Sequence, residues 1–302
     1  MTTPIRFDEQ VVLVTGAGGG LGRAHAMALA QRGARVLVND LGGSVNGQGS
    51  SASAADQVVE EIVAAGGLAM ASQDNIATPD GAQAMVQSAL QAWRRVDALI
   101  NNAGILRDKS LIKMDPADFE AVLRVHLIGS ALCSRAVWPT FQERGYGRIV
   151  MTTSAAGLYG NFGQANYAAA KMGVLGLMNT LKDEGARHGI VVNAVAPVAL
   201  TRMTEGLALA EWMQQASPDK VSAAVLYLAS SACQSSGQIV AAGGGYFSGV
   251  RVMEGLGVRA GPSQSSPEFV AEHWSQIQDM SAARPFANAS DALVKTFGSP
   301  GE

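Results

Sequence analysis

Seven short apolar runs alternate along this chain with longer segments of helical period. The runs are VVLVT (11–15), RVLVND (35–40), LAMAS (68–72), VDALIN (96–101), RIVMTTS (148–154), IVVNAVA (190–196) and QIVAA (238–242). They are continuously apolar, as in parallel strands that are buried on both faces. Alternating strands and helices predict an α/β fold: a Rossmann-like, doubly wound parallel sheet of seven strands with helices on both faces.

The composition indicates one large domain followed by a tail. Of the 302 residues, 48% are hydrophobic and 16% are charged, which is enough apolar material for a sizeable core. Doubly wound sheets often form one unit of about 250 residues. We therefore expect a Rossmann-type domain over residues 1–245 and a helical C-terminal extension over residues 246–302 that packs on it. Within the extension, PEFVAEHWSQIQDM (267–280) predicts one helix and SDALVKTF a second.

Charge, cysteines and termini limit the classes of function. The net charge is −3 and the Lys and Arg residues are scattered, so no nucleic-acid partner is expected. Cys133 and Cys233 lie in apolar helical patterns and are expected to be buried free thiols. No stretch is apolar enough for a membrane span, the N-terminus lacks a signal-peptide pattern, and the last residues are not a peroxisomal Ser-Lys-Leu signal. These features predict a cytoplasmic protein.

A glycine-rich turn follows the first apolar run. The segment TGAGGGLG spaces Gly16, Gly20 and Gly22 as G-x-x-x-G-x-G and does not fit a strict G-x-G-x-x-G. Glycines in such a turn let the backbone approach a pyrophosphate and direct a helix N-terminus at it. A turn of this composition also occurs as a simple packing turn, so it needs support from other residues.

That support comes from Asp40, at the end of the second run. A carboxylate there can accept hydrogen bonds from the adenosine ribose hydroxyls and would repel a 2′-phosphate, so the sequence favours NAD over NADP as the cofactor. The alternative is an ordinary Asp that caps the turn in NDLGG. Arg23 is the nearby cation that could weaken the preference for NAD.

Tyr167, Lys171 and Ser154 form a candidate catalytic set. Tyr167 and Lys171 are four residues apart in a segment of helical period, so they project from one face of a helix. An ammonium beside a phenol is expected to lower the Tyr167 pKa and make Tyr167 a general base for an alcohol. Ser154 ends the fifth run, where its hydroxyl could bind the substrate oxygen. By itself, a Tyr-x-x-x-Lys pair is more often a surface pair than a site.

Taken together, TGAGGGLG, Asp74, NNAG (101–104), Ser154 and the YAAAK block resemble the short-chain dehydrogenase/reductase family over about residues 7–245. The resemblance implies that Ser154 and Tyr167 contact the substrate alcohol and that Lys171 also holds the nicotinamide ribose. It further implies that Asp74 meets the adenine and that Asn102 and Gly104 support the sheet and the cofactor. The remaining residues implied to bind the cofactor are Leu21, Asn75, Ala199 and Thr201, along with Tyr167 itself.

A narrower resemblance concerns the substrate. The stretches VLVNDLGG, NNAGILRDKS, RVHLIGS, YGRIVMTTSAAGLYGNFGQANYAAAK, ALTRMTE and WSQIQDM are similar to the (3R)-hydroxyacyl-CoA dehydrogenase units of the type 2 multifunctional enzymes, a subgroup that includes 17β-hydroxysteroid dehydrogenases of type 4. This implies a stand-alone bacterial enzyme, a homodimer or homotetramer, that oxidises (3R)-3-hydroxyacyl-CoA to 3-oxoacyl-CoA with NAD in fatty acid β-oxidation. The alternatives are a hydroxysteroid dehydrogenase, a 3-oxoacyl-ACP reductase and, in another class, a non-catalytic NAD-binding protein.

Four further features concern single residues or segments. His126 stands where the family usually has a relay Asn, and we expect it to be a catalytic relay or support residue, although a core histidine is the usual meaning of a His on an apolar helix. The four histidines lack ligand spacing, so no metal is expected. The segment from Pro197 to Arg202 and on through TRMTEGLALAEWMQQ predicts a mobile substrate lid or a helix packed on the core, and LGGSVNGQGSSAS (41–53) predicts an inserted surface loop.

Overall fold

The computed structural model describes residues 3–49, 51, 53–199 and 216–297. It divides the chain into two compact units, Met1–Gly249 and Val250–Glu302, which are described here one at a time. The expected lid lies largely outside the described residues, as does Thr201.

The first unit is built on an eight-stranded sheet in the order β3-β2-β1-β4-β5-β6-β7-β8. The strands are β1 (Val11–Thr15), β2 (Arg35–Asn39), β3 (Leu68–Ser72), β4 (Ala98–Asn101), β5 (Gly147–Thr152), β6 (Ile190–Val198), β7 (Ile239–Gly243) and β8 (Tyr246–Val250). The pairs from β3 to β7 are parallel; Val12, for example, faces Val36 on one side and Ala98 on the other. The order reverses between β1 and β4, which is where doubly wound sheets bind their ligands.

The sheet has one strand more than the seven that the apolar runs predict. β8 follows β7 after Gly244 and Gly245, which have φ of +60° and +91°. Two successive residues with positive φ are typical of the tight turn between hairpin strands. The sequence analysis placed residues 246–250 in the tail because no residue of β8 is buried, so the strand does not have the continuous apolar character of the buried strands.

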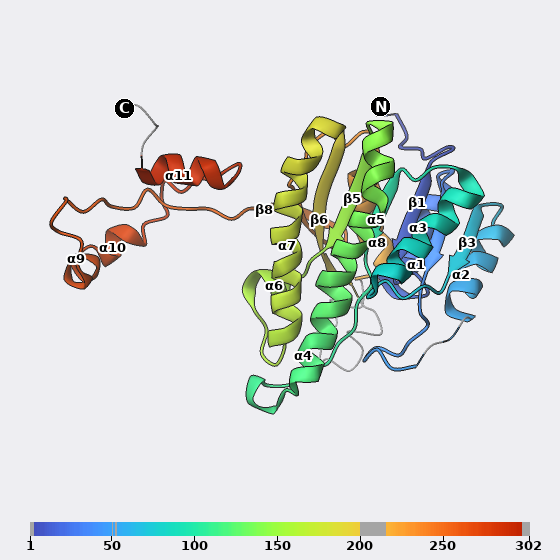
Figure 1. Ribbon diagram of the computed structural model, residues 1–302, viewed down its shortest axis with the longest axis horizontal. Coiled ribbons are helices and arrows are strands. Elements are labelled where there is room, and N and C mark those ends of the chain that lie inside the picture. The colour runs from blue at the N-terminus through green and yellow to red at the C-terminus, as the bar shows by residue number, and fades with distance from the viewer. Residues whose placement is uncertain (1–2, 50, 52, 200–215, 298–302) are drawn as a thin grey trace. The chain divides into compact units, whose positions relative to one another are not determined.

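Helices cover both faces of the sheet, as expected. One layer consists of α1 (Gly20–Gln31), α2 (Ser53–Ala64) and α8 (Pro218–Ala229), in which α1 contacts both of the others. The other consists of α3 (Pro79–Trp93), α5 (Gly129–Arg144) and α7 (Ala165–Gly185), with α4 (Pro116–Leu123) packed against α7. Figure 1 shows α5 and α7 in front of β5 and β6. Shorter elements complete the unit: α6 (Ala155–Tyr159), the 3-10 helices η1 (Leu111–Lys113) and η3 (Ala186–His188), and the π-helical turn η2 (Arg124–Ile128).

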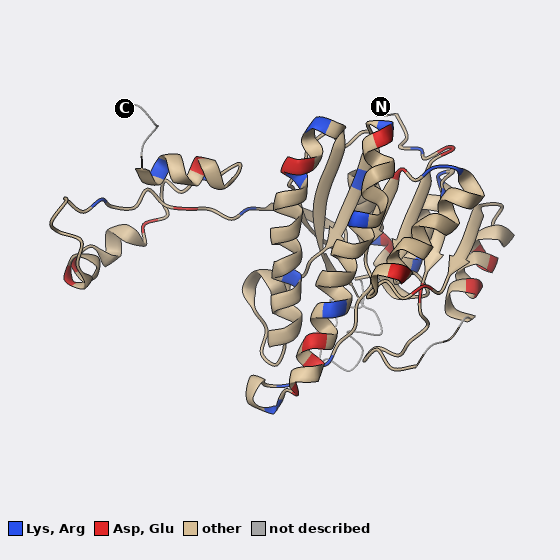
Figure 2. Ribbon diagram, in the orientation of Figure 1, with Lys and Arg blue, Asp and Glu red and all other residues tan. Residues whose placement is uncertain are grey.

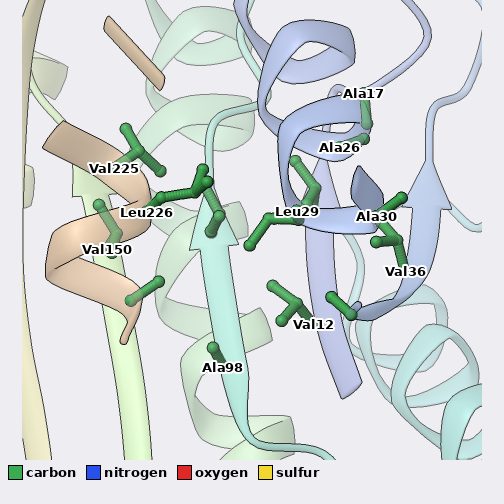
Figure 3. Close-up of a cluster of buried hydrophobic side chains, with 14 of the residues drawn as sticks. Val12, Ala17, Ala26, Leu29, Ala30, Val36, Ala98, Val150, Val225 and Leu226 are labelled. Carbon is green, nitrogen blue, oxygen red and sulfur yellow. The ribbon is translucent and has the colours of Figure 1, made fainter. Parts of the chain in front are cut away.

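The core on the α1 and α8 side shows why the apolar runs are continuous. Leu29 of α1 and Val225 of α8 pack with Val12, Ala98 and other strand residues into one buried cluster (Figure 3). Every residue of β1 is buried, so both faces of this strand need apolar side chains. Cys133 and Cys233 are buried free thiols, as predicted.

The described residues of the second unit form the short helices α9 (Pro267–Glu272), α10 (Trp274–Ile277) and α11 (Ala289–Phe297). Ser266 caps α9 by accepting a hydrogen bond from the backbone N–H of Phe269 at 3.1 Å. The single helix predicted over 267–280 is wrong, because α9 ends at Glu272 and α10 begins at Trp274. Between them, a ring nitrogen of His273 bonds the carbonyl oxygen of Phe269. A separate helix near SDALVKTF is confirmed as α11.

Residues of both charges are interspersed along the ribbon of the first unit in Figure 2. Within the residues that the structure covers, no helix is both long and apolar enough to cross a membrane.

Candidate active site

A pocket of about 370 Å³ lies at the carboxyl ends of the central strands, at the switch point. It brings together most of the site residues predicted from the sequence. Those that line it are Gly16, Gly20, Leu21, Asp40, Asp74, Asn75, Asn102, Gly104, His126, Tyr167 and Lys171. Gly22, Ser154 and Ala199 are described but are not among its lining residues.

The glycine-rich turn has the shape that a phosphate-binding turn requires. Gly16 has φ of +64°, and a Cβ atom there would lie 2.6 Å from the Cα of Ala103. A Cβ at Gly22 would lie 2.2 Å from the carbonyl oxygen of Gly16. Helix α1 begins at Gly20, so the backbone N–H groups of its first turn and its positive end are at the pocket. The turn therefore packs tightly, and its place at the start of α1 suits an anion, so phosphate binding by this motif stays a prediction.

Asp40 holds two loops together. Its Oδ2 accepts a hydrogen bond from the Gly18 backbone N–H at 2.8 Å, and its Oδ1 accepts one from the Gly42 N–H at 2.7 Å. The turn-capping role considered for Asp40 is therefore present. Each carboxylate oxygen has a second lone pair, so the group can still accept a ribose hydroxyl. The guanidinium of Arg23 pairs with Glu61 and not with Asp40. Arg23 therefore does not neutralise the Asp40 carboxylate.

Asp74 and Asn75 follow β3 at the neighbouring edge of the pocket. Asp74 Oδ2 accepts a hydrogen bond from the Ser72 hydroxyl at 2.8 Å, and the Asp74 carbonyl oxygen accepts one from the Asn39 amide at 3.0 Å. Asn75 caps the following turn by accepting from the Ala77 N–H at 3.0 Å. These bonds fix both residues at the pocket wall.

Asn102 joins the end of β4 to the glycine-rich turn. Its side-chain amide donates to the carbonyl oxygens of Thr15 and Gly16, each at 3.0 Å. The Thr15 hydroxyl accepts from the N–H groups of Asn102 and Ala103 at 3.0 and 3.1 Å. Asn102 therefore holds the backbone of the turn in place, which is the support role that the family resemblance implies.

The three proposed catalytic residues come from adjacent elements. Tyr167 and Lys171 lie one turn apart on α7, and Ser154 caps the N-terminus of α6 by accepting from the Ala156 N–H at 3.2 Å. The Lys171 ammonium donates to the carbonyl oxygen of Thr152 at 2.7 Å and lies 5.6 Å from the centre of the Tyr167 ring.

The electrostatics of the pair differ from the sequence expectation. Burial raises the pKa of Tyr167, and a hydrogen bond with Ser154 lowers it by a smaller amount. Burial lowers the pKa of Lys171 to about 7. The expected lowering of the Tyr167 pKa by Lys171 is wrong for the protein without ligand, because desolvation disfavours the charged form of both groups.

His126 lines the pocket and packs against Tyr167. It is 1% exposed, and burial and the charge of Lys171 hold its pKa well below the usual value. Its ring lies edge-on to Tyr167, with centroids 5.2 Å apart. Its Nε2 lies 2.8 Å from the carbonyl oxygen of Ile105, while Nδ1 has no hydrogen-bond partner among the described residues. A Cβ at Gly104 would lie 2.2 Å from the His126 ring, so the glycine makes room for it.

The pocket also has walls that the sequence analysis did not assign to the site. Thr152 and Ile105 line it, together with Arg107, Arg124 and part of the 41–53 loop. Pro197, at the start of the expected lid, also lines it. The Thr152 hydroxyl is buried and unpartnered in the part of the chain that the structure covers. A signal for Thr152 was its place two residues before Ser154 at the end of a strand. Apart from the masked stretches, no three His, Cys, Asp or Glu side chains cluster so as to hold a metal ion.

Fold and site together define a Rossmann-type oxidoreductase. The profile of the short chain dehydrogenase family matches residues 10–212, and the chain belongs to the short-chain dehydrogenase/reductase family. It is thus an oxidoreductase that acts on a CH–OH group.

Three similar proteins illustrate the relationship. Over 94% of its length the chain is 46% identical to peroxisomal multifunctional enzyme type 2 of Mus musculus, of which it spans 38%. It is 45% identical over 92% of its length to a short-chain type dehydrogenase/reductase of Mycobacterium tuberculosis, of which it spans 96%. The structure matches 7α-hydroxysteroid dehydrogenase complexed with NADH and 7-oxo glycochenodeoxycholic acid with a TM-score of 0.72 and 30% identity, covering 80% of this chain and 95% of that one.

Proposed function

We propose that the protein oxidises a (3R)-3-hydroxyacyl-CoA to the 3-oxoacyl-CoA with NAD as the hydride acceptor. The observation that carries the proposal is the convergence of Tyr167 and Lys171 with the glycine-rich turn and Asp40 in one pocket. The acyl-CoA substrate rests on the similarity to multifunctional enzymes, of which this chain matches only a part.

The residues of the pocket fit a dinucleotide. The N-terminal turn of α1 suits the pyrophosphate and Asp40 suits an unphosphorylated ribose. When bound, NAD supplies the acceptor for the hydride that leaves the carbinol carbon. Asp40 supports NAD over NADP, as does the fact that none of the described residues forms an ion pair with it.

Residues of the chain bind the hydroxyl oxygen of the substrate and remove its proton. Ser154 binds the substrate hydroxyl, and the Tyr167 phenolate removes its proton as the C–O bond becomes a carbonyl. Lys171 is 4% exposed, and its bond to the Thr152 carbonyl fixes its ammonium one helical turn from Tyr167. His126 packs against the Tyr167 ring and limits its movement.

Formation of NADH, followed by absorbance, tests the proposal with purified protein. The arms are (3R)- and (3S)-3-hydroxyacyl-CoA thioesters, each with NAD and with NADP. Turnover confined to the 3R thioesters and NAD supports the proposal; turnover only of 3S thioesters, or only with NADP, contradicts it. Tyr167→Phe should lower kcat by roughly 10²- to 10⁴-fold, whereas Tyr159→Phe, a matched change at a tyrosine that is 76% exposed, should not.

A hydroxysteroid dehydrogenase is the second candidate, because the structural match includes an enzyme solved with a bile-acid ketone. Estradiol and a 7α-hydroxy bile acid belong in the same assay. A kcat/KM for a steroid above that for every 3R thioester would favour this candidate and leave the roles proposed for Ser154 and Tyr167 in place.

A further inference from the structure

The loop of residues 41–49, which follows β2, forms one wall of the cofactor pocket. Gly43, Ser44, Val45, Gly47 and Gly49 line the pocket. The loop begins beside Asp40, whose Oδ1 accepts a hydrogen bond from the Gly42 N–H. This wall is therefore at the adenosine end of the proposed cofactor site.

The loop is held in place by the segment that follows β4. The Leu106 N–H donates to the Val45 carbonyl oxygen at 2.9 Å. The Arg107 Nε–H donates to the Asn46 carbonyl oxygen, also at 2.9 Å. Gly47 has φ of +80°, and a Cβ there would lie 3.0 Å from Ile105. Strands β2 and β4 are separated by β1, so these contacts carry the loop across the end of the sheet at the switch point.

Arg107 has a second anchor on α4. Its Nη1 donates to Asp118 Oδ1 at 3.0 Å, and Lys109 Nζ donates to Asp118 Oδ2 at 3.1 Å. Hydrogen bonds from Lys109 and Arg107 lower the pKa of Asp118, which keeps this carboxylate charged at neutral pH. The planar guanidinium binds two acceptors in fixed directions, which an ammonium on a flexible stem does less well.

The backbone of Arg107 reaches the catalytic helix. Its carbonyl oxygen accepts a hydrogen bond from the Asn166 side-chain amide at 3.0 Å, and Asn166 Oδ1 accepts one from the Tyr167 N–H at 2.7 Å. Asn166 is 0% exposed. One residue thus connects the loop at the adenosine end of the pocket, helix α4, and the start of the helix that carries Tyr167.

We propose that Arg107 is a positioning residue that latches the 41–49 loop over the adenosine end of the cofactor and slows cofactor release. The proposal rests on the proposed function for the identity of the cofactor. The latch itself is the pair of side-chain bonds from Arg107 to Asn46 and Asp118. Because the Asn166 bond uses the backbone, side-chain variants of Arg107 leave the start of α7 in place.

Arg107→Met in the full chain tests the latch. We expect the dissociation rate of NADH, measured by stopped-flow displacement with fluorescence detection, to rise roughly tenfold, the equivalent of one charge-assisted hydrogen bond. KM for NAD should rise while KM for the alcohol stays the same. The NADH dissociation rate of Arg107→Lys should lie between those of Arg107→Met and the unmodified protein, since lysine can bind one of the two acceptors. Lys109→Met is the matched control, because it removes the other cation on Asp118 without touching the loop.

Hydrogen exchange supplies a readout that does not depend on the cofactor. In Arg107→Met without ligand, the Leu106 amide and the amides of residues 43–49 should exchange faster than in the unmodified protein and in Lys109→Met. An NADH dissociation rate within twofold of the unmodified protein, or unchanged exchange, overturns the latch. If NADH leaves the fluorescence of the unmodified protein unchanged, the proposed cofactor is wrong, and the exchange of Leu106 then decides the latch alone.

Discussion

Replacing Lys171 by methionine should stabilise the folded protein at neutral pH while it removes a proposed catalytic group. Burial lowers the pKa of Lys171 from 10.5 to about 7. Since one pKa unit is worth about 1.4 kcal/mol, the protonated side chain is about 5 kcal/mol less favourable in the folded protein than in the unfolded chain. At pH 7 nearly all of this penalty is present. Loss of the bond to the Thr152 carbonyl costs about 1 to 2 kcal/mol, which leaves a net gain of about 2 to 3 kcal/mol.

The pH dependence of this gain identifies its cause. Between pH 7 and 10.5 the unfolded chain keeps the Lys171 proton and the folded protein does not, so the stability of the unmodified protein rises with pH through this window. Lys171→Met lacks this contribution. Its advantage should be largest below pH 7 and should shrink above it.

Urea unfolding followed by circular dichroism, at several values from about pH 6 to about pH 9, measures the effect. Lys113→Met, which removes an exposed ammonium, is the control and should change the free energy of unfolding by less than about 0.5 kcal/mol throughout. A difference between Lys171→Met and the unmodified protein that stays constant with pH would refute the reasoning, as would a destabilised variant at every pH.

Three further predictions follow from the site. Gly104→Ala should destabilise the protein by about 2 kcal/mol or more and lower activity, because the added methyl meets the buried His126 ring; thermal unfolding and kcat check both effects, and a fully active, equally stable variant would contradict the packing. Thr152→Val should change stability by less than about 1 kcal/mol, since the described structure gives the Thr152 hydroxyl no partner to lose; a larger loss in urea unfolding would count against this. The rate of alcohol oxidation should rise from neutral to alkaline pH because burial raises the Tyr167 pKa; a rate that falls over this range would exclude Tyr167 as the base.

Much of the fold could be predicted from local patterns. Strands such as β1 are buried on both faces, so their position shows directly as a run of apolar residues. The sequence analysis missed β8 because its residues are not buried and its sequence, YFSGV, is not continuously apolar. The local signal for β8 was the pair Gly244 and Gly245 in the preceding turn. Two adjacent glycines are typical of the tight turn of a β-hairpin.

The candidate site was predictable where spacing alone fixes geometry. Four residues of helix place Tyr167 and Lys171 on one face, and a strand followed by glycines places the turn at the sheet edge. The 41–49 wall was not predictable, because residues more than fifty positions away in the chain, Leu106 and Arg107, determine where this loop lies. Local composition showed only that a loop was present.

The charge states of Tyr167 and Lys171 also could not be predicted from the sequence. Spacing shows that an amine is near a phenol but not how much water surrounds them, and burial acts on the two groups in opposite directions. In the protein without ligand, Tyr167 is therefore a neutral phenol at pH 7 and the positive charge of Lys171 is only partly present. Under the proposed function, a nicotinamide ring held in this pocket would supply a positive charge that favours the Tyr167 phenolate. Tyr167 would then be a more effective base in the presence of the cofactor than in the protein alone.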